Sequence, residues 1–367
     1  MFIRVARRSS LGQARHVTPV PPPAAGDLVA QVYAQVERDF GMLAPPIALH
    51  SPSPQALAAS WVILRETLVA TGVTGRAVKE AVGAAVSRSN TCPYCVDVHA
   101  ATLRGLADDG SAARDATAVA TGGADAIGDA GLREIVRWAG ASGRRDPARR
   151  GRPPGSPAEA AELAGVAVTF HYLNRMVNVF LRESPFPPGL PAAARGGLLR
   201  LLVRVLRGAT LGTHPPGASL DLLPPAEPAV PLGWAAGSPT VTEAFARAST
   251  AVEAAGVRSV PGSVRELVTA TLADWDGTEP PLSGGWPGDL VTGLPPADRP
   301  AGRLALLTAL ASYRAGPGAV EAFRRTGSDD RALIELTSWA AMTAALTVGG
   351  WSNTVSAEPI NTERTDR

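Results

Sequence analysis

Apolar residues recur at helical spacing along most of this chain of 367 residues. Between positions 27 and 40 the apolar residues lie near one helical face: Leu28, Val29, Val32, Tyr33 and Val36. Ala-rich segments with the same period occupy residues 54–70, 75–89 and 157–183. No segment shows the alternation of apolar and polar positions that is typical of strands. The pattern therefore predicts an all-α fold.

Prolines, glycines and a threonine mark candidate ends of these helices. Pro54 stands at an N-terminal helical position, where its missing N–H is not needed. Thr74 is placed to cap the next helix, and Gly110 stops the helix that follows the cysteines. Residues 121–157 are rich in Gly, Arg, Asp and Pro, and we expect an irregular connection around one short helix at 131–139.

The second half of the chain repeats the first in outline. Residues 52–90 have a counterpart in residues 238–277, in which Glu266 stands where the first copy has Glu80. Farther on, residues 160–177 are echoed by residues 331–348 in the same way. The second copy has no cysteine: Thr278 and Pro281 stand where the two cysteines would be. We interpret the chain as two tandem similar units, the second of which has lost the chemistry of the first.

This interpretation divides the chain into five segments. They are a disordered Arg/Pro-rich tail at 1–26, an active unit at 27–185, a Pro/Gly-rich linker with one helix at 186–231, a degenerate unit at 232–356 and a tail at 357–367.

Composition narrows the class of protein. Hydrophobic residues make up 45% of the chain, which is enough for a large core, and the net charge of +2 gives no sign of a nucleic-acid partner. The chain has no run of about 18 apolar residues, so we expect no membrane-spanning helix. The basic N-terminus lacks the apolar core of a secretory signal. We expect a cytoplasmic protein with neither a nucleic-acid nor a membrane partner.

The only cysteines, Cys92 and Cys95, stand in the stretch SNTCPYCVDVHAA, with His99 four residues after the second. A structural disulfide here closes too short a loop to add much stability. Zinc needs a fourth ligand that the sequence does not offer, and haem attachment needs histidine where Val96 stands. CPYC also marks the glutaredoxin active site, but that fold requires a strand before the motif, and the segment before this one is helical. A redox dithiol remains, and the sequence indicates neither metal nor cofactor.

Each residue type in the motif has a use in thiol chemistry. A cysteine near a helix N-terminus is stabilised as thiolate by the helix dipole. Cys95 and His99 are four residues apart on one helical face, so the imidazole can take the thiol proton. A glutamate from the preceding helix, Glu80, can orient that imidazole or pass the proton on. Cys92 is placed to resolve a sulfenic acid into a disulfide.

The spacing Glu80-x11-Cys92-x2-Cys95-x3-His99 resembles that of the alkylhydroperoxidase D-like proteins of the carboxymuconolactone decarboxylase superfamily. The resemblance covers about residues 40–183 and, more loosely, 232–353. It implies an all-α alkylhydroperoxidase D-like fold and peroxidase activity on hydrogen peroxide or small organic hydroperoxides. It also implies that Cys95 is the peroxidatic thiolate, Cys92 the resolving thiol, and Glu80 with His99 the proton relay.

The resemblance has further implications for partners. It implies a dithiol reductant, either a lipoyl-bearing or a thioredoxin-like protein, and a homo-oligomer, here a trimer of two-unit chains. The best-known members carry a histidine just before the second cysteine, where this chain has Tyr94. This departure leaves peroxidase efficiency and the donor open.

Other interpretations of the same residues stand beside this one. A dithiol–disulfide oxidoreductase with poor peroxide turnover and a redox sensor or assembly protein are the alternatives, and lactone decarboxylation ranks low. Taken singly, Glu80 is typical of a solvated helix face and His99 of a core histidine. His171 and Tyr172 are candidates for the pocket floor or the core, and Asn174 and Arg175 for buried polar or interface positions.

Overall fold

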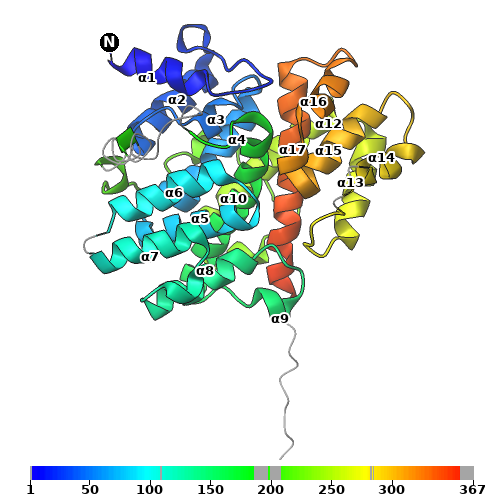
Figure 1. Ribbon diagram of the computed structural model, residues 1–367. Helices are drawn as coiled ribbons and strands as arrows, with labels where there is room; N and C mark the ends of the chain where they lie inside the picture. Colours follow the sequence, from blue (N-terminus) through cyan, green and yellow to red (C-terminus); the bar gives the residue numbers. More distant parts are fainter. Residues whose placement is uncertain are drawn as a thin grey trace, which may run out of the picture.

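The computed structural model describes residues 2–107, 110–185, 197–198, 208–281, 283 and 285–355, and every regular element among them is a helix. The prediction of an all-α fold is confirmed. Figure 1 shows most helices of the first half on one side of the molecule, α13 to α16 on the other, and α17 running between them.

The first half forms a compact set of helices joined by short turns. Its elements are α1 (Phe2–Leu11), η1 (Pro22–Ala24), α2 (Asp27–Phe40), α3 (Pro45–Ala48), α4 (Pro54–Leu64), η2 (Arg65–Val69), α5 (Arg76–Ser89), α6 (Pro93–Gly105), α7 (Gly110–Thr121), η3 (Ala124–Ala126), α8 (Ala130–Ala141), α9 (Pro147–Arg150) and α10 (Pro157–Phe180).

The second half has fewer long helices and more short ones. Its elements are η4 (Leu220–Leu222), η5 (Gly233–Ala235), α12 (Pro239–Ser259), α13 (Gly262–Asp274), α14 (Trp286–Leu290), η6 (Val291–Gly293), α15 (Arg299–Ala311), η7 (Ser312–Arg314), α16 (Pro317–Arg324), α17 (Asp330–Trp351) and η8 (Ser352–Val355).

Helix α10 is the central element of the first half. It begins with a capping box, in which the Ser156 side chain accepts from the N–H of Glu159 while the Glu159 carboxylate accepts from the N–H of Ser156, and Pro157 occupies the first turn. From Val166 to Val177 every side chain is buried, because α10 packs against α5 on one side and α17 on the other. A helix apolar on most faces belongs in a core, and α10 thereby becomes the wall against which the cysteine-bearing helices rest.

Helices in matched positions of the predicted repeat pack against each other. α4 lies along α12, and α10 along α17, as elements related by a two-fold axis do. The division into two units stays a prediction. α17 is long and apolar enough to cross a membrane by length and composition, but 78% of its most apolar window is buried inside the fold.

The structure corrects the prediction of a disordered tail at 1–26. Residues 2–11 are helical, and the segment behind them is hydrogen-bonded to the body of the protein. The Arg15 N–H donates to Phe180 O at 2.7 Å, and Tyr33 Oη donates to Val20 O at 2.9 Å. The Arg/Pro-rich composition concealed a segment that is ordered by these long-range contacts.

Thr74 does not cap α5, contrary to the prediction. Gly75 is the N-cap residue, and Thr74 Oγ1 is buried without a hydrogen-bond partner. The short helix predicted at 131–139 is present as α8. The helix predicted within the 186–231 linker, at 192–208, lies almost wholly outside the described residues.

Candidate active site

Both cysteines lie at the start of α6, just after the corner that follows α5. Thr91 takes a left-handed φ of 51° in this corner, a conformation uncommon for residues other than glycine. Cys92 is the N-cap residue of α6, and its N–H donates to Ser87 O at 2.9 Å. Cys95 consequently lies in the first turn of α6, where unpaired backbone N–H groups favour a negative charge.

Glu80 and His99 form a buried pair between α5 and α6. His99 Nδ1 lies 2.6 Å from Glu80 Oε2, and Arg76 Nε donates to Glu80 Oε1 at 2.7 Å. Burial by itself raises the pKa of Glu80, but Arg76 and His99 outweigh it and hold this pKa below its ordinary value. When Nδ1 donates to the carboxylate, Nε2 is left as the proton acceptor of His99.

The two cysteines are free thiols with almost no exposed surface, 1% for Cys92 and 3% for Cys95. The hydrogen bond that Cys95 shares with Cys92, together with burial, raises the pKa of the Cys95 thiol well above its ordinary value. Asn174 and Ser87 act in the opposite direction and lower the pKa of Cys95, which favours the thiolate. The resting Cys95 is therefore a thiol, and its reaction as a nucleophile requires a base.

A largely apolar cavity of about 120 Å³ opens beside Cys95 and His99. The other side chains around it come from α2, α3, α4, α6, α10 and the segments next to them. They are Gln13, Phe40, Met42, Ala44, Pro45, Pro46, Leu64, Tyr94, Val98, Phe170, Leu173 and Pro185. The His99 ring stands edge-on to Phe170, with ring centroids 4.6 Å apart. A small molecule in this cavity meets both the sulfur and the imidazole.

The N-terminal segment takes part in this cavity. Tyr94 Oη donates to Gln13 Oε1 at 2.9 Å, so the residue between the cysteines is tied to the chain just after α1. Burial, followed by the two neighbouring cysteines, raises the pKa of Tyr94 far above its ordinary value, and its phenol stays protonated. Tyr94 thus holds the N-terminal segment over the cavity and does not release its proton at neutral pH.

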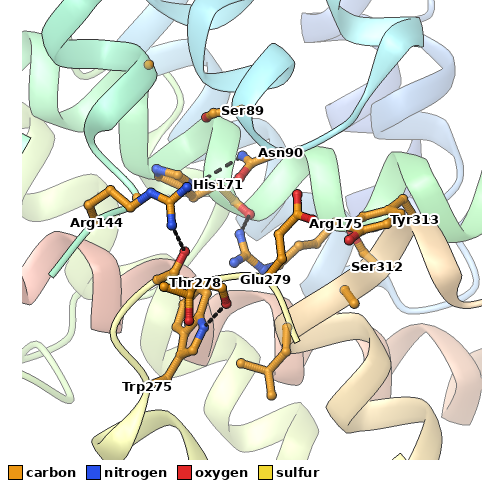
Figure 2. A pocket seen from close by; sticks show the side chains of 15 residues that line it. Ser89, Asn90, Arg144, His171, Arg175, Trp275, Thr278, Glu279, Ser312 and Tyr313 are labelled. Carbon is orange, nitrogen blue, oxygen red and sulfur yellow. Dashed lines mark hydrogen bonds between the residues drawn. The ribbon is translucent and has the colours of Figure 1, made fainter. Parts of the chain in front are cut away.

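A chain of hydrogen bonds leads away from the sulfur along α10. Asn174 Nδ2 donates to Ser87 Oγ at 3.0 Å, and Asn90 Nδ2 donates to Asn174 Oδ1 at 2.9 Å. Asn90 Nδ2 also lies 3.1 Å from His171 Nδ1, and His171 Nε2 lies 3.0 Å from Ser142 Oγ. The chain ends at a second, polar cavity, which Figure 2 shows.

The other candidates on α10 divide between site and core. Tyr172 belongs to the core: its hydroxyl contacts His50 Nε2 at 3.0 Å and Ser338 Oγ at 3.3 Å, away from both cavities. His171 and Arg175 line the polar cavity, and burial lowers the pKa of His171 well below its ordinary value. Asn174 lowers the pKa of the Cys95 thiol.

The structure brings together the four residues that the spacing selected, and it adds Ser87, which sequence reasoning missed. Ser87 follows Glu80 by seven residues, or two helical turns, and so shares its face of α5. This seven-residue spacing is the sequence signal that could have identified Ser87. The contact of Asn174 with the sulfur has no such signal, because it joins separate helices.

The second half does not reproduce this arrangement. Glu266 on α13 is exposed to solvent. Within the described part of the chain, no group of three or more His, Cys, Asp or Glu side chains is placed to hold a metal ion.

Comparison with known proteins agrees with this geometry. The chain is 38% identical over 341 residues to a protein of Mycobacterium tuberculosis named as an alkyl hydroperoxide reductase, and the match covers 92% of this chain and 94% of that protein. No model of a known protein family matches the chain.

Proposed function

The chain belongs to the alkyl hydroperoxide reductase family, and from this premise we propose that it is a peroxide-reducing oxidoreductase that works through a Cys92–Cys95 redox disulfide. The observation that carries the proposal is the buried Glu80–His99 pair together with Cys95, which is coupled to a second thiol, Cys92; the Cys95 side chain and the His99 imidazole both line one apolar cavity. Nucleophile, base, orienting carboxylate and resolving thiol are then all present.

The first half of the cycle oxidises Cys95. His99 Nε2 takes the Cys95 proton, and Glu80 stabilises the imidazolium through Nδ1. The thiolate attacks one oxygen of the hydroperoxide, an S–O bond forms and the O–O bond breaks. The leaving alkoxide takes the proton from His99 and departs as an alcohol, and Cys95 becomes a sulfenic acid.

The second half of the cycle closes the disulfide. The Cys92 sulfur attacks the Cys95 sulfur, the S–S bond forms, and hydroxide leaves with the Cys92 proton as water. One hydroperoxide and two thiols have then given one alcohol, one water and one disulfide. A dithiol donor, either a lipoyl group or a thioredoxin-like protein, reopens the bond and is itself oxidised.

Ser87 and Asn174 lower the barrier to the first step. Both side chains lower the pKa of the Cys95 thiol and so favour the charged sulfur that attacks the peroxide. They oppose the effects of Cys92 and of burial, both of which favour the protonated thiol. We assign them as positioning residues of the thiolate.

The cavity favours organic hydroperoxides over hydrogen peroxide. Its lining includes Phe40, Met42, Leu64, Phe170 and Leu173, and its volume of about 120 Å³ leaves room for a short alkyl or a small aryl group. An apolar group gains free energy in such a space, at about 0.8 kcal/mol for each buried CH₂. Hydrogen peroxide has no group that gains in this way.

A stopped-flow titration of the fully reduced protein tests the proposal. The expected result with a small alkyl hydroperoxide is rapid loss of two thiols and two mass units per chain, absent in Cys95→Ser. Cys92→Ser is expected to complete one cycle and then over-oxidise at Cys95. Oxidation no faster than that of a free thiol would remove the peroxidase assignment.

A second candidate is a dithiol–disulfide oxidoreductase or redox sensor with little peroxide turnover. The observation that favours it is Tyr94, a protonated phenol tied to Gln13, where the best-known related proteins carry a histidine. Steady turnover with a lipoyl or thioredoxin-like donor would exclude the sensor. A disulfide that forms once and changes the oligomeric state, without turnover, would favour it. A cytoplasmic location and assembly into trimers are parts of the same proposal, testable by fractionation and by sizing.

A further inference from the structure

A second cavity, of about 90 Å³, lies between the two halves of the chain (Figure 2). Helix α10 borders both cavities: Phe170 and Leu173 face the apolar one, whereas His171 and Arg175 face this one. The second half contributes Trp275 and the residues after it, together with η7 and the end of α15. Unlike the apolar cavity, this one is lined mainly by polar side chains.

Arg175 is the central charge of this cavity and has no carboxylate partner. It is 94% buried. Its Nε donates to Ala309 O at 2.9 Å and its Nη1 to His171 O at 2.5 Å, both of them neutral acceptors. Among the residues that the structure describes, no carboxylate lies within 4.0 Å of the guanidinium and none accepts from its Nη2. Burial lowers the pKa of Arg175 to about 10, so it is charged at neutral pH.

A buried cation without a counter-ion is costly, because the loss of hydration is not offset by an opposite charge. Two other arginines are buried among the described residues, and they differ. Arg150 donates to the carbonyl oxygens of Arg144, Arg145 and Trp351, whereas Arg65 is paired with carboxylates. Its Nε lies 2.7 Å from Asp39 Oδ2, and its Nη1 lies 2.7 Å from Glu66 Oε1. Arg175 thus lacks the carboxylate partners of Arg65, and, in addition to carbonyl acceptors like those of Arg150, it borders an open cavity.

Further donors border the same space. Ser312 Oγ accepts from Asn178 Nδ2 at 3.0 Å, which leaves the hydroxyl hydrogen of Ser312 free to be donated. In Figure 2, Arg144 and Arg175 approach the cavity from opposite sides, with Trp275 below it. The Trp275 ring centroid is 6.0 Å from the Arg175 guanidinium carbon, and the ring covers one face of this cation.

We propose that this cavity binds a small monocarboxylate, which supplies the counter-ion of Arg175 and accepts from Ser312, with Arg144 at the mouth. A carboxylate matches the planar fork of a guanidinium. The volume of about 90 Å³ limits the ligand to a few heavy atoms. Glu279 also lines the cavity, and Asp276 lies near Arg144, so their negative charges oppose a dianion such as phosphate or sulfate.

Isothermal titration calorimetry on the full chain tests the proposal without any peroxidase assay. The probes are formate, acetate and propionate at constant ionic strength in chloride, with phosphate and sulfate in parallel. One-site binding of at least one of the carboxylates, tighter than that of either dianion, is expected. No carboxylate binding, or tighter binding of phosphate, would overturn the proposal.

Variants locate the site. Arg175→Gln is expected to weaken carboxylate binding at least about tenfold, because it removes a charge-assisted bidentate pair. Ser312→Ala is expected to weaken it less, and Glu279→Gln to tighten it several-fold by removing a like charge. Arg149→Gln is the matched control, since Arg149 is exposed outside the cavity. If Arg175→Gln fails to fold, Ser312→Ala and Glu279→Gln still decide, and affinities unchanged in both would refute the site.

Discussion

Helices α5 and α13 carry glutamates at matched positions of the predicted repeat, but the two side chains have different environments. Glu80 is 1% exposed and holds both Arg76 and His99, whereas Glu266 lies on the surface. The cause is the cover: α6, α7 and α8 pack on α5, whereas α13 packs mainly on α15 and α17. A glutamate at the right spacing becomes part of the candidate site when a neighbouring helix buries it against a histidine.

The long helices α10 and α17 differ in the same way. In the predicted alignment, Asn174 corresponds to Ala345 and Arg175 to Leu346. On α10, Asn174 lowers the pKa of Cys95 and Arg175 lines the polar cavity, whereas the two α17 residues are apolar. Both helices are buried in the core, so packing alone does not require polar residues at these positions. We attribute the polar residues of α10 to the proposed function.

The largest expected effect comes from removing the nucleophile. Cys95→Ser should abolish hydroperoxide consumption entirely, because the serine hydroxyl is not ionised at neutral pH. Consumption of an alkyl hydroperoxide by the reduced protein is the measurement. Cys92→Ser is the matched control, since it should retain the first oxidation. Equal rates for wild type and Cys95→Ser would end the comparison in favour of a structural dithiol.

Removing either member of the proposed proton relay, Glu80 or His99, should have the next largest effect. Glu266, at the matched position of the predicted repeat, provides the control. Glu80→Gln and His99→Ala should each slow the oxidation of Cys95 by about 10²- to 10⁴-fold, the usual contribution of a positioned acid or base. Glu266→Gln should leave this rate unchanged, because that side chain is solvated. The two glutamates are compared by single-turnover kinetics. A slow Glu266→Gln protein would show that the second half shares in the chemistry.

Giving α10 the residue found in α17 should have a smaller effect. Asn174→Ala removes a hydrogen bond that favours the Cys95 thiolate, so the pKa of Cys95 should rise and the rate at neutral pH fall about tenfold. The rate should recover as pH rises toward the new pKa, and a pH–rate profile measures this. Asn178→Ala, which removes bonds to Asn90 O and Ser312 but none to sulfur, is the control. Parallel profiles for wild type and Asn174→Ala would contradict the assigned role.

The smallest effect concerns stability. The folded state holds the pKa of Glu80 below its ordinary value of 4.5, so the ionised carboxylate stabilises the fold above that pH. This contribution is lost as pH falls through the lowered pKa. Glu80→Gln should cost about 2 kcal/mol in the free energy of unfolding at pH 7, the scale of hydrogen bonds to charged groups.

The difference between Glu80→Gln and wild type should shrink below about pH 4.5. Denaturant unfolding at pH 7 and pH 3.5 measures it. A difference that is the same at both pH values would show that the ion pairs of Glu80 contribute nothing to stability.

Local pattern was enough to predict much of the fold and part of the site. The apolar face at positions 27–40 predicted α2, whose bounds are Asp27–Phe40. The motif spacing from Glu80 to His99 selected two side chains whose Oε2 and Nδ1 atoms lie 2.6 Å apart. The spacing was informative because the chain between them follows two helices joined by one short corner. Sequence spacing predicts spatial proximity when the intervening chain is regular secondary structure.

Contacts between distant segments were beyond that reasoning. Residues 1–26 have a composition typical of disorder, yet Gln13 meets Tyr94 and Arg15 meets Phe180 only once the rest has folded. The approach of Asn174 to Cys95 depends likewise on how α10 lies across α6. The Thr74 cap was wrong because Gly75 already has the extended conformation that starts the helix.

The burial of both thiols has a consequence for the two substrates of the proposed cycle. With 1% and 3% of their surfaces exposed, the cysteines admit a peroxide that fits the cavity but exclude the bulk of a folded protein. The donor must therefore deliver electrons on a thin, extended arm, or wait until the Gln13–Tyr94 contact opens. The peroxide and the reductant then face separate size limits, and the N-terminal segment that covers the cavity sets the limit for the reductant.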